Sequence, residues 1–170
     1  MNLDFYREKL ESLDDFRKFR EENPEAFLCS GFFVIDKEGN DNKQHFDFFV
    51  PETGKMFSFQ LEEEKMVPLE NHGENFVPGE ISEGIGFDLD WVEEKILDEM
   101  SRKEVKNRMQ KLIFSLQKTE DGNFLLGTVF LTGFGMLKVN VNLDKGEITD
   151  FQKSSFFDMV KVFRKEDRAN

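Results

Sequence analysis

The sequence contains very few of the residues from which disulfides, metal centres and most catalytic sites are built. Its 170 residues include one cysteine, Cys29, and two histidines, His45 and His72. A single cysteine excludes an intramolecular disulfide and any cysteine-cluster metal site. The chain also has no Gly-x-Ser-x-Gly motif and no phosphate-binding glycine loop ending in Gly-Lys-Ser/Thr. We therefore expect no enzyme activity, no cofactor and no bound metal.

Long apolar runs and an excess of positive charge are also missing. No run approaches the ~20 apolar residues of a membrane-spanning helix, and the start of the chain is too acidic for a signal peptide. The formal net charge of −12 would repel a nucleic-acid backbone. We expect a cytoplasmic protein that binds neither nucleic acid nor membranes directly, and whose protein partner could be basic.

Phenylalanine dominates the residues that can form a core. The chain has 21 phenylalanines against one tryptophan and one tyrosine. Each buried phenylalanine removes roughly 150–250 Å² from water, so even half of them would hold a domain of this size together.

Two segments have the apolar spacing of amphipathic helices. Residues 3–23 place apolar side chains three or four positions apart, and Pro24 ends the pattern. Residues 89–108 repeat this spacing, with Asp88 or Asp90 as the N-cap and two glutamates in the first turn.

Short alternating segments separated by turn residues indicate β-strands. We expect Phe57, Phe59, Leu137 and Val139 to be core residues of these strands. The tail, 155–167, fits either a short helix or an edge strand. The predicted strands are 26–36, 45–50, 56–61 and 65–69, followed by 111–118, 124–131, 136–143 and 147–152.

A helix followed by strands occurs twice along the chain, with Thr-Gly turns at Gly54 and Gly133 in matching places. This order predicts an α+β fold made of two helix-then-antiparallel-meander repeats packed as one domain. The predicted boundaries are 1–69 for the first half, 70–88 for a linker loop and 89–170 for the second half.

The segment 139–149, Val-Asn-Val-Asn-Leu-Asp-Lys-Gly-Glu-Ile-Thr, carries a resemblance to a known family. Together with the preceding helix and meander, it resembles the PepSY and PepSY-like domains. That resemblance implies a strand that ends a sheet packed on a helix, and a regulatory role such as modulating a protease.

Several polar groups could be mistaken for metal or catalytic sites. Residues 36–47 carry oxygen ligands in a pattern that crudely resembles a calcium loop, but Asp41 stands where that loop requires glycine. We interpret this segment as a charged hairpin tip. His72 and Glu74 would need a third ligand. The oxygen-bearing residues of the hairpin are Asp36, Glu38, Asn40, Asn42 and Asp47.

The remaining titratable side chains have simple interpretations. His45 lies on the polar face of its strand and is expected to be solvated. The runs Glu62-Glu63-Glu64 and Glu93-Glu94 are expected to be solvated faces, because acid–base catalysis needs a desolvated cleft. Cys29 is expected to be a small buried thiol.

The strand at 124–131 is apolar on both faces, so both faces should be covered. A helix would cover one face. The second cover could be the other half of the chain, a partner subunit or a small apolar ligand, and we expect the other half. The two sets of side chains are Phe124, Leu126 and Phe130 on one face and Leu125, Val129 and Leu131 on the other.

These observations favour a non-enzymatic binding or regulatory module that acts through contacts with a partner protein or with a second copy of itself. Two alternatives stay open: an acidic mimic of nucleic acid that inhibits a nucleic-acid-binding protein, and a carrier of a small apolar ligand.

Overall fold

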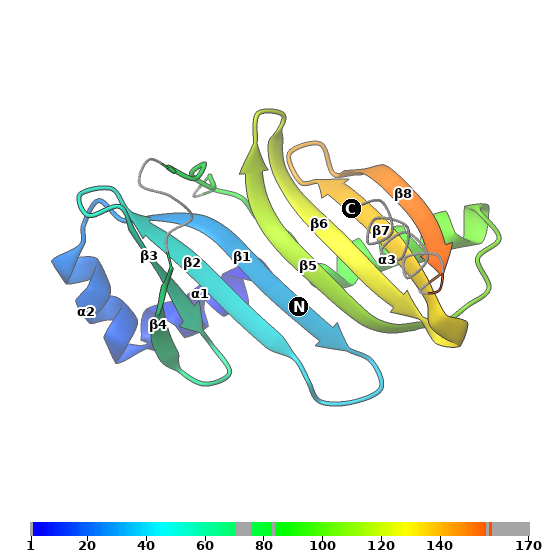
Figure 1. Cartoon of the computed structure of the whole chain (residues 1–170), viewed down its shortest axis with the longest axis horizontal. Helices are drawn as coiled ribbons and strands as arrows, with labels where there is room; N and C mark the ends of the chain where they lie inside the picture. Colours follow the sequence, from blue (N-terminus) through cyan, green and yellow to red (C-terminus); the bar gives the residue numbers. More distant parts are fainter. Residues whose placement is uncertain (1, 71–75, 83, 156, 158–170) are drawn as a thin grey trace, which may run out of the picture.

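The computed structural model describes residues 2–70, 76–82, 84–155 and 157. Within these residues the fold is α+β: three α-helices lie on one side of a single eight-stranded antiparallel sheet (Figure 1). The α+β class predicted from the sequence is therefore confirmed. No helix of the described chain is long and apolar enough to cross a membrane.

The sheet is two antiparallel meanders joined edge to edge. Its strand order is β4-β3-β2-β1-β5-β6-β7-β8, so the first strand of one meander pairs with the first strand of the other. This pairing places Phe33 directly opposite Phe114. The strands are β1 (Phe27–Asp36), β2 (Lys43–Val50), β3 (Lys55–Gln60), β4 (Lys65–Leu69), β5 (Met109–Thr119), β6 (Gly122–Leu131), β7 (Gly135–Asn142) and β8 (Glu147–Ser155).

The first predicted helix is two helices. The helix α1 (Leu3–Ser12) and the helix α2 (Asp14–Glu22) are separated at Leu13, whose ψ of 127° is extended. The Ser12 hydroxyl donates a hydrogen bond of 2.6 Å to the Lys9 carbonyl, a local bond that competes with helix continuation. The break lets both apolar stripes reach the curved sheet.

The helix α3 (Leu89–Arg102) ends six residues before the predicted end at 108. Asp88 caps its start, accepting a hydrogen bond of 2.8 Å from the Asp90 backbone N–H. At the other end Glu104 adopts a left-handed φ of 55°, and the Val105 N–H donates to the Met100 carbonyl at 2.8 Å. This left-handed cap ends the helix without the glycine that usually marks one.

The core lies between the helices and the sheet. Phe16 and Phe19 of α2 pack edge-on against Phe59, with ring centroids 5.0 and 5.1 Å away. Val92 and Ile96 of α3 are fully buried. Among the predicted core residues, Phe59, Leu137 and Val139 are fully buried, but Phe57 is only half-buried because it lies beside the short edge strand β4.

Part of the predicted linker packs into this core. Ile81 and Phe87 are buried, and the Ile81 N–H donates to the Leu28 carbonyl at 2.9 Å. The Leu3 N–H donates to the Phe87 carbonyl at 3.0 Å, so the segment after residue 76 contacts α1 as well as β1. The predicted tail beyond Ser155 lies outside the described residues, apart from Phe157.

Candidate functional site

The helix-free face of the sheet carries a patch of apolar side chains across its centre. Because side chains alternate along a strand, the residues between the core positions point away from the helices. Val34 of β1 is opposite Ile113 of β5. Two residues earlier in β1, Phe32 lies in the same cross-strand row as Leu126 of β6. We call Phe32, Val34, Ile113, Leu126 and Phe130 the central patch.

The described residues do not meet the expectation that the other half covers this face. Leu125, Val129 and Leu131 lie in the helix-covered core, as expected for one face of β6. The side chains on its other face, Phe124, Leu126 and Phe130, are half-buried. In the described part of the chain the two halves lie side by side in one sheet, not face to face (Figure 1).

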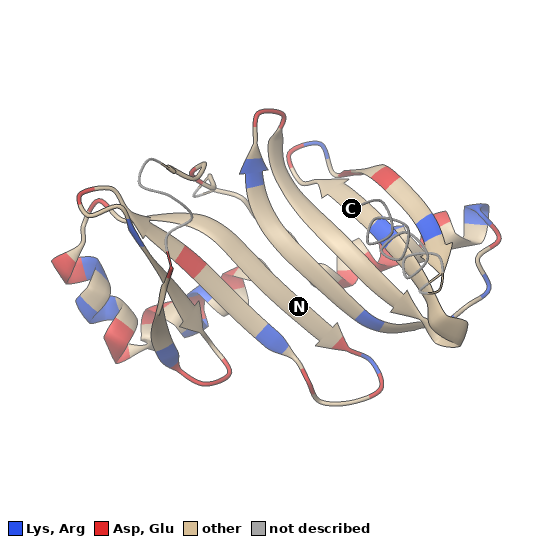
Figure 2. Cartoon of the chain, in the orientation of Figure 1, with Lys and Arg blue, Asp and Glu red and all other residues tan. Residues whose placement is uncertain are grey.

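Lysines border the central patch at one end of the strands. Lys43 and Lys138 lie in the same cross-strand row as Val34 and Ile113. Lys111 lies opposite Phe130 in the next row. Figure 2 shows that the middle of the strands carries few charges, while acids gather at the helices and turns.

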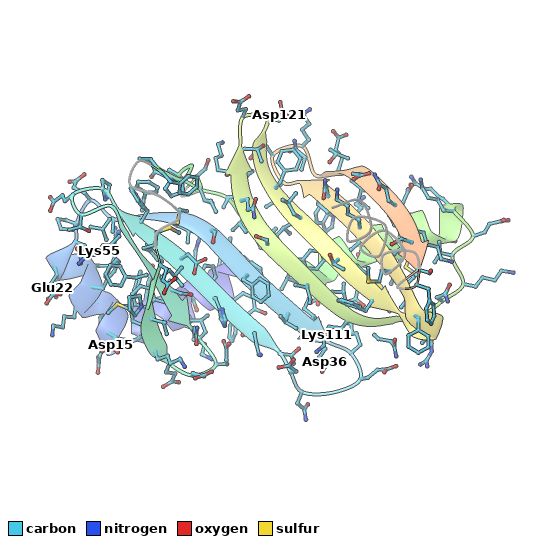
Figure 3. All side chains as sticks on the ribbon, in the orientation of Figure 1. Asp15, Glu22, Asp36, Lys55, Lys111 and Asp121 are labelled. Carbon is cyan, nitrogen blue, oxygen red and sulfur yellow. The ribbon has the colours of Figure 1, made fainter. Side chains whose placement is uncertain are left out.

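The predicted calcium-like hairpin is organised by its own backbone. Asp36 accepts hydrogen bonds from the N–H groups of Glu38 and Gly39 at 3.2 and 3.0 Å. Desolvation acts against ionisation, but these N–H donors outweigh it and lower the pKa of the Asp36 carboxyl. Lys111 lies beside it and pairs with Asp41 at 3.0 Å (Figure 3). The carboxylate of Asp36 is therefore engaged inside the turn.

His45 and two of the predicted solvated glutamates make close polar contacts. The Nε2 atom of His45 lies 2.6 Å from Glu62 Oε1, and both side chains are only about one-fifth exposed. The ring of His45 also packs against Phe32, with centroids 5.7 Å apart. Glu93 pairs with Lys37 at 2.6 Å. As whole residues, Glu62, Glu63, Glu64 and Glu94 are exposed, as predicted, whereas His45 and Glu93 are half-buried, so the prediction of a solvated group is wrong for those two.

Cys29 is buried, as predicted, at an irregularity in β1. Its thiol donates to the Asp47 carbonyl at 3.2 Å. Burial and then the nearby Asp47 carboxylate raise the pKa of the Cys29 thiol to about 12. A thiol with so high a pKa is a poor nucleophile, because the thiolate is the reactive form.

Two buried asparagines are features that the sequence interpretation missed. Asn123 is 1% exposed, and its side-chain NH₂ donates to Asp144 Oδ1 at 2.9 Å and to Ser82 Oγ at 3.3 Å. These bonds join the start of β6 to the β7–β8 turn and to the segment between the halves. Asn142 accepts from the Lys145 N–H at 3.0 Å and so fixes the same turn.

A cavity of about 640 Å³ lies between α1, α2, β1 and β2, which is within the size range of small-ligand sites. Its apolar wall includes Phe16, Phe46 and Phe48, but these rings are at most 7% exposed. Arg7 and Arg20 and several glutamates line the accessible part. The cavity therefore offers a ligand mainly charged groups.

No group of three or more histidine, cysteine or acidic side chains suited to a metal ion occurs in the described part of the chain. His72 and Glu74 lie outside that part.

Comparison with known proteins gives a likeness of fold. No protein-family model matches the chain, and no curated protein matches it. Among solved structures, the crystal structure titled a "putative lipoprotein" from Clostridium difficile 630 is similar, with a TM-score of 0.54 and 13% sequence identity. The match covers 83% of this chain and 91% of that one. At this identity the chain shares a fold with that protein, and its function has to be argued from its own residues.

Proposed function

We propose that the protein is a non-catalytic binding module that holds a partner protein on the helix-free face of its sheet. The observation that supports this proposal is the central patch, which joins apolar side chains of β1, β5 and β6 in adjacent cross-strand rows. Contiguous apolar surface of this kind marks interaction sites in soluble proteins. Val34 is already buried, but Phe32, Ile113, Leu126 and Phe130 are half-buried. A partner that covered these four side chains would gain the free energy of removing their exposed parts from water.

A protein fits this face better than a small molecule does. The patch lies across several strands of one broad sheet surface, whereas small ligands bind in concave sites that enclose most of their surface. Polar side chains such as Ser115 and Thr128 alternate with the apolar ones and offer hydrogen bonds to a partner's surface. Protein interfaces have this mixture of an apolar centre and polar surroundings.

The test compares binding by the wild-type chain with binding by Leu126→Glu, which places a charge in the patch. Partners captured from native lysate are identified, purified and titrated against both proteins. We expect the glutamate to weaken binding about tenfold or more, and Lys55→Glu, a surface change at another end of the sheet, to leave it unchanged. Equal binding by the Leu126→Glu variant would contradict the proposal. Sedimentation of the same proteins measures self-association.

We also propose that the two halves arose by duplication of a PepSY-like unit. Each half consists of one helical segment followed by four antiparallel strands. Gly54 and Gly133 occupy the turn between the second and third strands of their halves, with left-handed φ values of 65° and 73°. A cytoplasmic location is consistent with Cys29 being a free thiol.

The cavity beside α1 and α2 favours a second candidate function, the carriage of a small ligand. Its charged opening and buried phenylalanines would suit an amphiphile more than a purely apolar molecule. Native mass spectrometry of untreated protein would test this. A bound small molecule displaced by Phe48→Trp, which fills the cavity, would favour carriage.

A further inference from the structure

The turn between β6 and β7 holds an exposed phenylalanine in an unfavourable backbone conformation. Phe134 has a φ of 60°, a value that is a genuine outlier for a bulky side chain. Its ring is 67% exposed, so it contributes little to the core. The ring packs edge-on against Phe157, with ring centroids 5.6 Å apart, and Phe157 is itself 60% exposed. The turn therefore carries an exposed aromatic pair, one member of which has a strained backbone. Residues with such strain cluster at functional sites.

This turn is held firmly by its neighbours. The Thr132 N–H donates to the Arg108 carbonyl at 2.9 Å, and the Arg108 N–H donates to the Thr132 hydroxyl at 3.1 Å. The Asn107 side chain donates to the Thr132 carbonyl at 2.8 Å and accepts from Lys153 Nζ at 3.1 Å. Figure 1 shows the segment leading from α3 into β5 passing beside this turn. The ring is thus presented from a fixed base.

A small cavity lies next to the ring, and Phe130 and Met136 of the helix-free face form part of its lining. Its volume is about 280 Å³, and Phe130, Met136, Gln110 and Phe134 line it. Phe130 and Met136 are a cross-strand pair, and Phe130 belongs to the central patch. An exposed ring beside an apolar hollow is the geometry of an interface anchor, because one partner side chain can fill the hollow while the ring packs against its neighbours.

The charges around this turn are opposite in sign to the charge of the whole chain. Residues 102–111 contain five cationic side chains and one acid, although the net charge is −12. Lys138 is 63% exposed, and its acidic neighbour Asp150 is 3.9 Å away. Lys106 and Arg108 are exposed, with no ion pair among the residues that the structure describes. Asp121 lies at the opposite end of the strands from Lys111 (Figure 3).

We propose that this corner, formed by Phe134, Phe130, Met136 and the surrounding cations, anchors an acidic segment of the partner protein that inserts an aromatic or aliphatic side chain into the small cavity. The proposal rests on the proposed function and specifies the chemistry of the partner. The net negative charge of the chain acts on a partner at long range, and salt screens it. The short-range contacts at the corner decide which segment of the partner fits.

A protein segment fits the corner better than an anionic membrane surface does. The hollow beside Phe134 needs a side chain to fill it, while membrane insertion needs only a protruding apolar tip. A membrane would also bring many negative charges against a chain of charge −12, whereas a short segment brings few.

The test selects binders from a displayed library of random short peptides on the full-length protein. We expect the enriched peptides to combine acidic residues with an aromatic or aliphatic residue. One such peptide is then synthesised with a fluorescent label and titrated against variants. Phe134→Gly removes the ring and also relieves the left-handed strain, so it should weaken binding about tenfold or more while the melting temperature stays equal or rises. Lys138→Glu should also weaken binding of the peptide.

The matched control is Phe5→Ala, which removes a phenylalanine of similar exposure, 54%, from the helix-covered side. It should leave binding unchanged. Enrichment of basic peptides, or equal binding by Phe134→Gly, overturns the anchor. If Leu126→Glu abolishes that binding while Phe134→Gly does not, the docking face stands without this corner; if neither variant matters, both proposals fail. Cosedimentation with phosphatidylserine-containing vesicles that depends on Phe134 would assign the corner to membranes instead.

Discussion

Phe33 and Phe114 face each other across the pair of strands at which the two halves of the sheet meet. Both side chains are fully buried. Phe33 packs edge-on against Phe46 and Phe87, with ring centroids 5.7 and 5.6 Å away, so it contacts its own half and the segment that leads to the second half. Phe114 lies against Gly127 of the neighbouring strand. These two rings therefore couple the halves through one continuous core.

Gly127→Ala should destabilise the protein because Phe114 occupies the space that a methyl group would need. A Cβ at Gly127 would lie 2.6 Å from Cε1 of Phe114 and 3.2 Å from the Val139 carbonyl oxygen. We expect a loss of about 1–3 kcal/mol in the free energy of unfolding, measured by denaturant titration.

Two further variants check the cause of that loss. Gly84→Ala is the matched control, since nothing lies within 4 Å of its added methyl group. Phe114→Leu made together with Gly127→Ala should cost less than the sum of the two single changes. If the cost of the double change equals the sum of the two single costs, contact with the Phe114 ring is not the cause of the loss in stability.

Asp144 should make the stability of the protein depend on pH in the acid range. The Asn123 side chain and then the Asn123 backbone N–H lower the pKa of the Asp144 carboxyl by donating hydrogen bonds to it. A group whose pKa is lower in the folded state stabilises that state above its unfolded pKa, about 3.9, and this stabilisation is lost as pH falls through the folded pKa. We expect Asp144→Asn to reduce the fall in melting temperature below about pH 4.

The control is Asp121→Asn, an identical change of charge in the neighbouring β5–β6 turn. It should change the fall in melting temperature at acid pH less than Asp144→Asn does. Equal effects would mean that general charge repulsion, and not the Asn123 hydrogen bonds, causes the dependence.

The strands could be predicted from the sequence because their alternation is a local property. Phe46 and Phe48 of β2 and Leu137 and Val139 of β7 repeat every second residue and are buried together. The helix boundaries were harder to predict from the sequence. Leu13 continues the apolar stripe although its backbone is extended, and the cap after α3 uses Glu104 where a sequence interpretation would look for glycine.

The candidate site could be predicted only in part. The pattern in 124–131 identified Phe124, Leu126 and Phe130 as one apolar face. It could not show that β1 pairs with β5, because that pairing joins residues far apart in the chain. Phe134 stands between Gly133 and Gly135 and suggests a turn, but neither its exposure nor its left-handed φ can be inferred from its residue type.

Cys29 should react very slowly with thiol reagents in the folded protein. With a pKa of about 12, only about one thiol in ten thousand is ionised at pH 8, and the side chain is 5% exposed. We expect labelling by a disulfide reagent to be on the order of a thousandfold slower than in denaturant. Fast labelling of the native protein, with an unchanged circular dichroism spectrum, would contradict both the burial and the high pKa.

Cleavage in the segment between the halves should leave the two fragments bound to each other. Phe76 is 53% exposed there, so brief chymotrypsin treatment should cut after it, and Phe76→Ser should protect the site. After cleavage β1 still pairs with β5, and the Ile81 N–H still donates to the Leu28 carbonyl. Each fragment alone would bury too little surface to be comfortably stable. We expect the fragments to co-elute in native gel filtration, to separate in denaturant, and to recover their β-sheet spectrum only when mixed. Fragments that stay folded and monomeric apart would show that the halves are independent domains.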